Sequence, residues 1–177
     1  MNRIKKILAP TDLSDLSQTG VRYALEMANS QEGAEVIVYH VIGYEEAAPH
    51  DEMFRAESLS SWLLEDRKKF LAELLRNNYA ELVTKVSARP EVEIGLPERR
   101  IVEKAVAEAV DMIVMCTHGR TGLLHLLIGS VTEKVVRWAP VLAHGTSAEG
   151  CNLGQGRGLT AFPGVKIKRR FDSDNKL

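Results

Sequence analysis

The amino-acid sequence predicts a single α/β domain built on an open, doubly wound parallel sheet. Two observations support this prediction. Short apolar runs typical of buried strands alternate along the chain with longer segments whose apolar residues recur at helical spacing. The chain has 177 residues, enough for one well-buried core but too few for two comfortable domains. In such sheets, ligands bind at the carboxyl ends of the strands, where the strand order reverses.

The first strand is expected at residues 4–10, a short apolar run. Residues 11–14 supply side chains that cap helices, and apolar residues at helical spacing follow as far as Gly33, which is expected to end the helix. A β-branched run at 36–41 predicts a second buried strand. Residues 43–50 are expected to form a loop.

A long amphipathic segment at 52–79 predicts the next helix. Two of its aromatic residues, Trp62 and Phe70, are expected to anchor it in the core, because aromatic side chains dominate core packing. The third strand is expected at 82–94, with a break at Pro90.

A further helix is expected to begin at Gly95-Leu96-Pro97, and the apolar run at 112–115 predicts a fourth strand. A last helical pattern begins at Val131. Composition then changes, since six of the thirteen glycines lie in the segment 145–164. We therefore divide the chain into an α/β domain at 1–143 and a Gly-rich, basic, irregular tail at 144–177.

The composition limits the class of protein. Apolar residues make up 45% and charged residues 27%, as in soluble globular proteins. A net charge of −1 argues against nucleic-acid binding through overall basicity. No apolar run is long enough to span a bilayer, and the one near the start is too short for a signal peptide. Two cysteines are too few for a disulfide scaffold, so we expect reduced thiols in a cytoplasmic protein.

A glycine-rich segment, CTHGRTGLLHLLIGS at 116–130, joins the fourth strand to the last helix. It is not a Walker A loop, because the chain contains no Gly-Lys dipeptide, and the nearest dinucleotide fingerprint, at 154–158, follows no strand. Gly129 and Ser130 lie at the expected helix start, where unpaired N–H groups and the helix dipole favour a phosphate. Ser130 could cap this helix or donate its hydroxyl to a phosphate oxygen.

Asp12 follows the first strand and is expected at the same edge of the sheet. Its carboxylate could hold a ribose hydroxyl or a metal-bound water. Capping of the helix that follows is an equally good interpretation.

Three segments resemble the universal stress protein family: KKILAPTDLSDLS, YHVI at 39–42, and DMIVMCTHGRTGLLHLLIGSVTEKVVRWAPV. The resemblance covers roughly residues 2–143. It implies an open, Rossmann-like parallel sheet of about five strands, with the fifth at Val141-Leu142-Ala143, and a homodimer formed through that edge strand. Because His144-Gly145 would end the strand early, we expect a weak dimer or one braced by the tail.

The ATP-binding members of that family carry Gly-x-x-Gly, nine residues, and then Gly-Ser or Gly-Thr, and this chain has Cys116 in place of the first glycine. We expect Cys116 to keep extended geometry and to turn its side chain toward the sheet. The resemblance implies that Asp12 meets the ribose, that the Val41 backbone meets the adenine edge and that Arg120 helps to neutralise phosphate charge. The candidate nucleotide-binding residues are Pro10, Thr11, Asp12, Val41, Cys116, His118, Gly119, Arg120, Gly129, Ser130, Val131 and Thr132.

Catalytic constellations are poor. Asp12, His118 and Ser130 could meet at one edge, but the chain has no Gly-x-Ser-x-Gly elbow. The cysteine and histidines of the loop lack zinc-site spacing. His40 lies in a predicted strand and is expected to pack or hydrogen-bond internally. No catalytic base can be named, so we expect slow ATP hydrolysis at most.

The sequence therefore predicts a cytoplasmic, homodimeric universal stress protein that binds ATP, accompanied by Mg²⁺ or Mn²⁺, and acts as a regulatory nucleotide-binding module in the stress response. One alternative is a nucleotide-free stress protein that acts as a dimeric partner-interaction module. An enzyme of the related adenine-nucleotide hydrolase architecture is less well supported, because acid–base residues are lacking. We expect no membrane partner and no nucleic acid.

Overall fold

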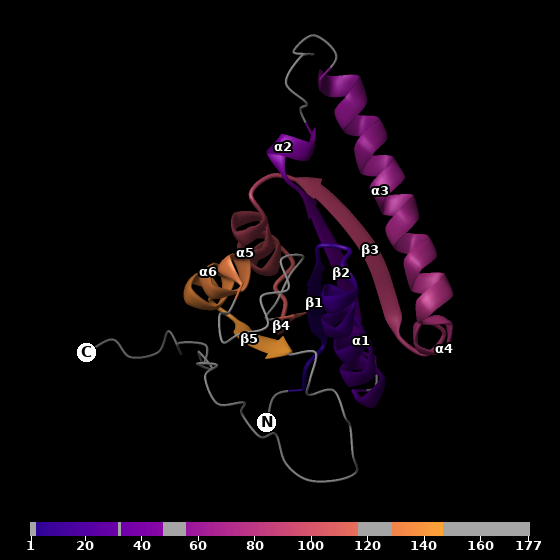
Figure 1. Ribbon diagram of the computed structural model, residues 1–177. Coiled ribbons are helices and arrows are strands. Elements are labelled where there is room, and N and C mark those ends of the chain that lie inside the picture. The colour runs from indigo at the N-terminus through magenta and orange to yellow at the C-terminus, as the bar shows by residue number, and fades with distance from the viewer. Residues whose placement is uncertain (1–2, 32, 48–55, 117–128, 147–177) are drawn as a thin grey trace, which may run out of the picture.

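A computed structural model describes residues 3–31, 33–47, 56–116 and 129–146 of the chain. Its centre is a parallel sheet with the strand order β3-β2-β1-β4-β5 (Figure 1). This sheet confirms the predicted fold class. The strands are β1 (Lys6–Thr11), β2 (Glu35–Ile42), β3 (Ser87–Ile94), β4 (Met112–Cys116) and β5 (Leu142–Thr146).

Helices cover both faces of the sheet (Figure 1). One face packs against α1, α3 and α4, and the other packs against α5 and α6. The short α2 occupies part of the segment expected to be a loop. The helices are α1 (Asp15–Ser30), α2 (Tyr44–Ala47), α3 (Ala56–Asn78), α4 (Ala80–Val83), α5 (Pro97–Ala107) and α6 (Ser130–Trp138).

The inner strands send successive side chains to opposite layers. Ile7 and Val36 pack with α1 and α3, whereas their neighbours Leu8 and Ile37 pack with α5 and α6. All four side chains are fully buried. Burial on both faces explains why these strands appear in the sequence as continuous apolar runs.

The order of the strands reverses between β1 and β4. From β1 the chain adds β2 and β3 on one side and then crosses to add β4 and β5 on the other. The registered pairs between β1 and β4 are Ile7–Met112 and Leu8–Ile113, in the amino-terminal part of β1. This is the switch point at which open α/β sheets bind their ligands.

Helix α1 lies very close to β4 at Gly20, which is buried. A Cβ atom there would stand 2.9 Å from the backbone nitrogen of Cys116 and 3.2 Å from the carbonyl carbon of Met115. Real Cβ atoms essentially never approach backbone this closely, so the helix can occupy this position because residue 20 has no side chain.

The edge strand β3 carries a row of charged side chains on one face. Arg89 contacts Glu35 at 2.6 Å, and Lys104 of α5 contacts both Glu91 and Glu93 at 2.6 Å. The expected break at Pro90 is absent, because Pro90 stays in register opposite Val38. A proline is tolerated on an edge strand, where a backbone N–H need not be paired.

The predicted start of the third strand is wrong. Leu82 and Val83 belong to the helical turn α4, and the strand begins only at Ser87. Both side chains pack against the core with Tyr79, which is buried. The spacing of three and four residues from Tyr79 is helical, and it outweighs the loose alternation that suggested a strand from residue 82 onward.

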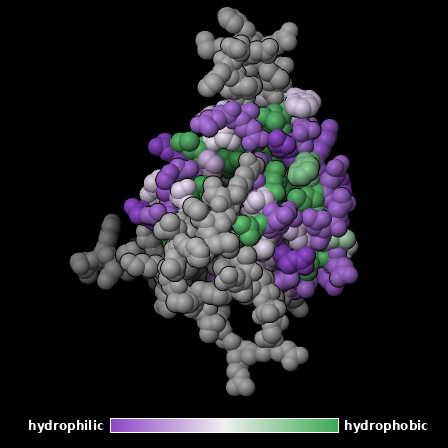
Figure 2. Space-filling model, viewed as in Figure 1, coloured by the Kyte–Doolittle hydropathy of each residue, from purple (hydrophilic) through white to green (hydrophobic). Residues whose placement is uncertain are grey.

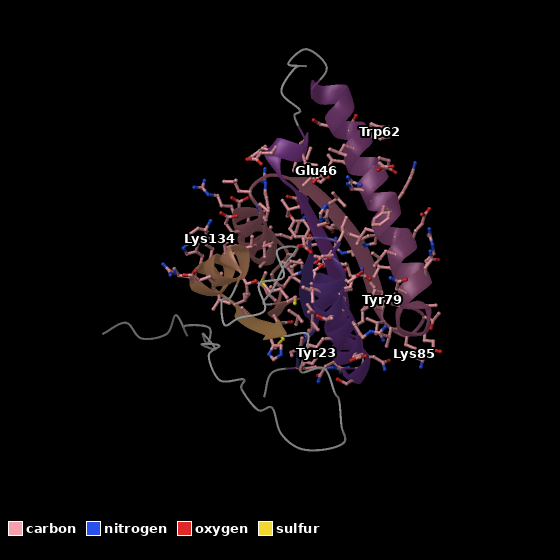
Figure 3. The ribbon with its side chains drawn as sticks, viewed as in Figure 1. Tyr23, Glu46, Trp62, Tyr79, Lys85 and Lys134 are labelled. Carbon is pink, nitrogen blue, oxygen red and sulfur yellow. The ribbon has the colours of Figure 1, made fainter. Side chains whose placement is uncertain are left out.

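The prediction that Trp62 and Phe70 anchor α3 in the core is also wrong, since these side chains are 64% and 47% exposed. The helix instead buries Leu71 and Leu75. Figure 3 marks Trp62 in the half of α3 that extends past the sheet, and Figure 2 shows mostly hydrophilic side chains along the side where α3 lies. The first residues of the predicted helix, 52–55, lie outside the described residues.

Strand β5 is longer than predicted. It continues through His144 to Thr146, paired with β4 from Met112–Leu142 to Cys116–Thr146. The His144 ring stacks on Tyr23 of α1, with 5.0 Å between ring centroids. Burial lowers the pKa of His144, which keeps its ring neutral near pH 7. Backbone pairing and this stack outweigh the local His-Gly composition; residues 147–177 lie outside the described part of the chain.

Candidate functional site

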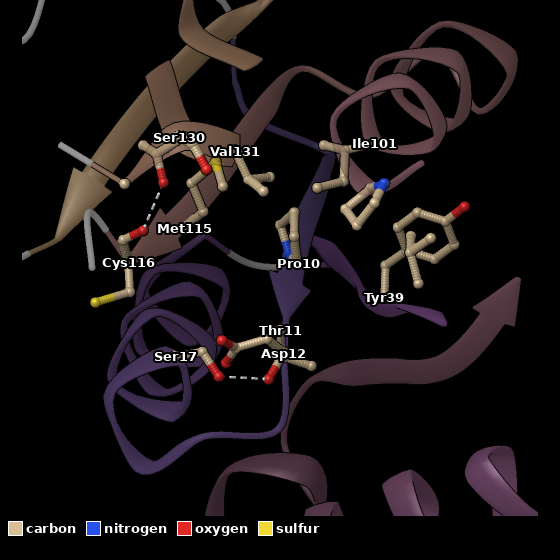
Figure 4. A pocket seen from close by; sticks show the side chains of 14 residues that line it. Pro10, Thr11, Asp12, Ser17, Tyr39, Ile101, Met115, Cys116, Ser130 and Val131 are labelled. Carbon is tan, nitrogen blue, oxygen red and sulfur yellow. Dashed lines mark hydrogen bonds between the residues drawn. The ribbon is translucent and has the colours of Figure 1, made fainter. Parts of the chain in front are cut away.

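A cavity of about 240 Å³ lies at the carboxyl ends of β1, β2 and β4 and at the amino ends of α5 and α6 (Figure 4). Its position is the switch point of the sheet. Its lining residues are Pro10, Thr11, Asp12, Ser17, Tyr39, Val41, Pro97, Ile101, Met115, Cys116, Gly129, Ser130, Val131 and Thr132.

The fold brings most of the candidate residues to this one cavity, although they come from three distant parts of the chain. The other candidates, His118, Gly119 and Arg120, lie outside the described residues. The candidates that line the cavity are Pro10, Thr11, Asp12, Val41, Cys116, Gly129, Ser130, Val131 and Thr132.

Helix α6 begins at the cavity, and its N-cap residue has no side chain that could cap its first amide groups. Gly129 is its N-cap residue, with φ −55° and ψ 145°, and no side-chain hydrogen bond caps it. Thr132, in the first turn, donates its hydroxyl to the buried carbonyl of Cys116 at 3.0 Å, which ties the helix start to the end of β4. The N–H groups of the first turn have no partner within the helix, and together with the positive end of the helix dipole they make this corner of the cavity favourable for an anion.

The opposite part of the cavity is apolar. Five side chains from β2, β4 and α5 form its wall, and three of them belong to the core beneath α5 and α6. A flat apolar ring fits such a wall, whereas charged groups are disfavoured there. The five residues are Tyr39, Val41, Pro97, Ile101 and Met115.

The Tyr39 side chain lies beside the charged side chains of Glu93 on β3 and Lys104 on α5. Burial, and then the neighbouring carboxylate of Glu93, raise the pKa of the Tyr39 phenol. Burial alone would raise the pKa of Glu93, but the Lys104 ammonium, 2.6 Å from the Glu93 carboxylate, outweighs it and lowers that pKa. The Lys104 ammonium also lies 5.4 Å from the centroid of the Tyr39 ring. The phenol is therefore neutral at pH 7, so the apolar wall carries no charge of its own.

Asp12 lies in the turn between β1 and α1. Its Oδ1 accepts hydrogen bonds from the backbone N–H of Ser14 at 3.1 Å and from the Ser14 hydroxyl at 2.5 Å. Ser14, not Asp12, is the N-cap residue of α1, since its side chain accepts from the Ser17 N–H. The alternative interpretation, in which Asp12 itself caps the helix, is therefore wrong, because the helix begins two residues later, after a turn at Leu13.

Five lining residues were not predicted from the sequence. Two of them could have been: Tyr39 precedes Val41 by two residues and so shares its strand face, and Pro97 follows the carboxyl end of β3. Nothing in the sequence indicates that the other three converge on the cavity. The missed residues are Ser17, Tyr39, Pro97, Ile101 and Met115.

Cys116 is 5% exposed and is the last residue of β4. Its φ is not positive, which confirms the extended backbone expected there. The Thr19 hydroxyl of α1 lies 3.8 Å from the Cys116 sulfur, and Figure 4 shows that sulfur beside α1, away from Pro10 and Tyr39. Cys116 therefore borders the cavity mainly with its backbone.

His40 is 2% exposed, and its Nδ1 lies 2.9 Å from the carbonyl oxygen of Thr11. This contact confirms the expected internal hydrogen bond. Among the described residues, no three His, Cys, Asp or Glu side chains are grouped so as to hold a metal ion. Within the same residues, no helix is both long and apolar enough to cross a membrane.

Comparison with known proteins identifies the relatives of this fold. The model of the universal stress protein family matches residues 3–143. The chain is 32% identical over 148 residues to universal stress protein MJ0577 of Methanocaldococcus jannaschii, covering 75% of this chain and 88% of the relative. It is 36% identical over 152 residues to MJ0531 of the same organism, covering 80% of this chain and 82% of that protein.

Solved structures show the same architecture. The structure of MJ0577 aligns with a TM-score of 0.65 at 28% identity, covering 81% of this chain and 96% of that one. A universal stress protein solved in complex with cAMP aligns with a TM-score of 0.56 at 18% identity, covering 82% of this chain and 98% of that one. At that identity, the second likeness shows the fold alone.

Proposed function

Because the chain belongs to the universal stress protein family, we propose that it binds ATP and acts as a regulatory nucleotide-binding module in the stress response. One observation carries the proposal: the uncapped start of α6 and the carboxylate of Asp12 border the same cavity as an apolar wall. These three parts match the phosphates, the ribose and the base of a nucleotide. A universal stress protein of the same fold has been solved in complex with cAMP.

Each part of the nucleotide has a proposed partner. The phosphates lie at the first turn of α6, from Gly129 to Thr132, with His118, Gly119 and Arg120 of the preceding loop beside them. Asp12 accepts a hydrogen bond from the ribose, and the adenine lies against Tyr39 with its edge at the Val41 backbone. An accompanying Mg²⁺ or Mn²⁺ would take most of its ligands from phosphate oxygens.

Direct identification of the ligand tests this proposal. Denaturing the purified protein and separating the released small molecules should yield an adenine nucleotide, and calorimetric titration of nucleotide-free protein should show one ATP site per chain. Because no catalytic base is identified, hydrolysis should be slow at most. Absence of both released nucleotide and measurable affinity would favour the alternative, a nucleotide-free module that acts through partner surfaces.

The Cys116→Gly variant is expected to bind ATP somewhat more tightly, by up to about tenfold, which corresponds to about 1.4 kcal/mol. The gain is limited because the sulfur lies beside α1 and away from the base wall. Titration of both proteins under reducing and oxidising conditions measures the difference. A loss of affinity that appears only in the oxidised parent would instead identify the thiol as a redox switch.

We also propose that the chain forms a homodimer through the edge strand β5, near Val141–Ala143. Because β5 continues to Thr146, it offers five residues for pairing. We therefore expect a variant lacking residues 148–177 to remain dimeric in sedimentation equilibrium. A shift to monomer in that variant would mean that the deleted tail stabilises the dimer.

A further inference from the structure

A chain of hydrogen bonds connects hydroxyl groups beneath the turn that carries Asp12. The backbone N–H of Leu13 donates to the Thr11 hydroxyl at 3.0 Å. The Thr11 and Ser17 hydroxyl oxygens lie 2.8 Å apart, and the Ser17 hydroxyl donates to the Ser14 carbonyl at 2.9 Å. Thr11 and Ser17 are 8% and 5% exposed, so water has little access to the chain.

The direction of these hydrogen bonds follows from counting protons. A serine hydroxyl has one proton, and that of Ser17 is donated to the Ser14 carbonyl. The Thr11 hydroxyl must therefore donate to Ser17 while it accepts from Leu13. With this assignment, removal of the Ser17 oxygen leaves the buried Thr11 proton without its acceptor.

The chain holds a strained turn. Leu13 has a φ of +67°, a left-handed conformation that is unfavourable for a residue with a Cβ. The Leu13 N–H bond to Thr11 stabilises that conformation. The backbone N–H of Ser17 meanwhile donates to the Ser14 hydroxyl, which donates to Asp12. Ser17 thus supports Asp12 by two routes, one through its side chain and one through its backbone.

We infer that Ser17 is a positioning residue, which acts through Thr11 to hold Asp12 and so makes the site selective for nucleotides whose ribose hydroxyls are both free. This inference rests on the proposed function. An ionised carboxylate accepts hydrogen bonds and cannot donate them. Asp12 can therefore bind the two hydroxyls of a ribose but forms no hydrogen bond with a sugar that lacks them. That preference requires a fixed carboxylate, because a mobile one forms each hydrogen bond less often.

Comparison of ATP with 2′,3′-dideoxy-ATP tests the inference. We expect Ser17→Ala to weaken ATP binding about tenfold and to leave the affinity for 2′,3′-dideoxy-ATP unchanged. Ser30→Ala is the matched control, because Ser30 lies on the same helix and donates to a carbonyl three residues earlier, at 2.7 Å, on an exposed surface. This control should change neither affinity.

The Ser17→Thr variant distinguishes loss of the hydroxyl from loss of folding. It keeps the hydroxyl and should keep the preference for ATP. Thr19 shows that a threonine hydroxyl in α1 can form the same bond to a carbonyl three residues earlier, at 2.7 Å. Equal losses for both nucleotides in Ser17→Ala, or no loss for either, would overturn the inference. A parent protein that binds neither nucleotide would overturn the proposed function instead.

Amide hydrogen exchange in the absence of nucleotide tests the same chain of hydrogen bonds. Amide hydrogen exchange at Leu13 should be faster in Ser17→Ala than in the parent, because the Leu13 N–H ends the route that runs through the Ser17 side chain. Exchange near Ser30 should stay unchanged. Unaltered exchange at Leu13 would contradict the role of Ser17 whatever the nucleotide affinity.

Discussion

The Gly129→Val variant is expected to lose ATP affinity by at least about 100-fold, or about 2.7 kcal/mol, while it keeps its fold. Gly129 has φ −55° and ψ 145°, which valine adopts without strain. Its branched side chain would stand where phosphate oxygens are proposed to meet the amide groups of α6, and hydrogen bonds to charged groups are worth about 1.5–3 kcal/mol each. Calorimetric titration measures the loss.

Two further variants make this test specific. Gly129→Ala adds only one carbon and should cause a smaller loss than valine. Ser130→Ala removes a hydroxyl but keeps the backbone N–H, so it should weaken binding only modestly. Circular dichroism and thermal unfolding of Gly129→Val should resemble those of the parent. Unchanged ATP affinity in a folded Gly129→Val protein would refute the phosphate assignment.

A second large effect is expected from Gly20→Val, which should lower the free energy of unfolding by about 3 kcal/mol. The atoms that a Cβ would meet at 2.9 and 3.2 Å belong to the backbone of β4 and cannot rotate away. Helix α1 must therefore move off the sheet, although valine is itself a slightly better helix former than glycine. Denaturant unfolding followed by circular dichroism measures the change.

Asn29→Val is the matched control, since Asn29 is exposed near the end of the same helix. This change should alter stability by less than about 0.5 kcal/mol. Because Met115 and Cys116 line the cavity, the displaced helix in Gly20→Val should also weaken ATP binding. A Gly20→Val protein as stable as the parent would mean that α1 and β4 separate at little cost.

The sequence predicted the parallel sheet well because its strands are buried on both faces. Residues such as Ile37 and Val38 have no solvent-facing alternative, so their apolar run has one interpretation. The glycine-rich segment likewise identified the start of α6, because Gly129 and Ser130 are characteristic of a helix terminus that receives an anion. Both signals depend on residues that are close together in the sequence, so contacts with distant residues do not change their interpretation.

The errors arose where the outcome depends on distant residues. The sequence does not reveal which face of α3 meets the sheet, so Trp62 was expected in the core although it is exposed. The end of β5 depends on pairing with β4 and on the stack between His144 and Tyr23, which lie far apart in the chain. Ser17 appeared to be an ordinary helix residue, because its role depends on the hydroxyl of Thr11.

The two edges of the sheet differ in a way that limits how many copies can assemble. On β3, a proline without an N–H and the charged row of Arg89, Glu91 and Glu93 oppose the addition of another strand. On β5, no described strand pairs with the outer side. If a further strand can be added at just one edge of the sheet, the first pairing between two chains occupies that edge. Association through β5, as proposed above, would therefore stop at two chains.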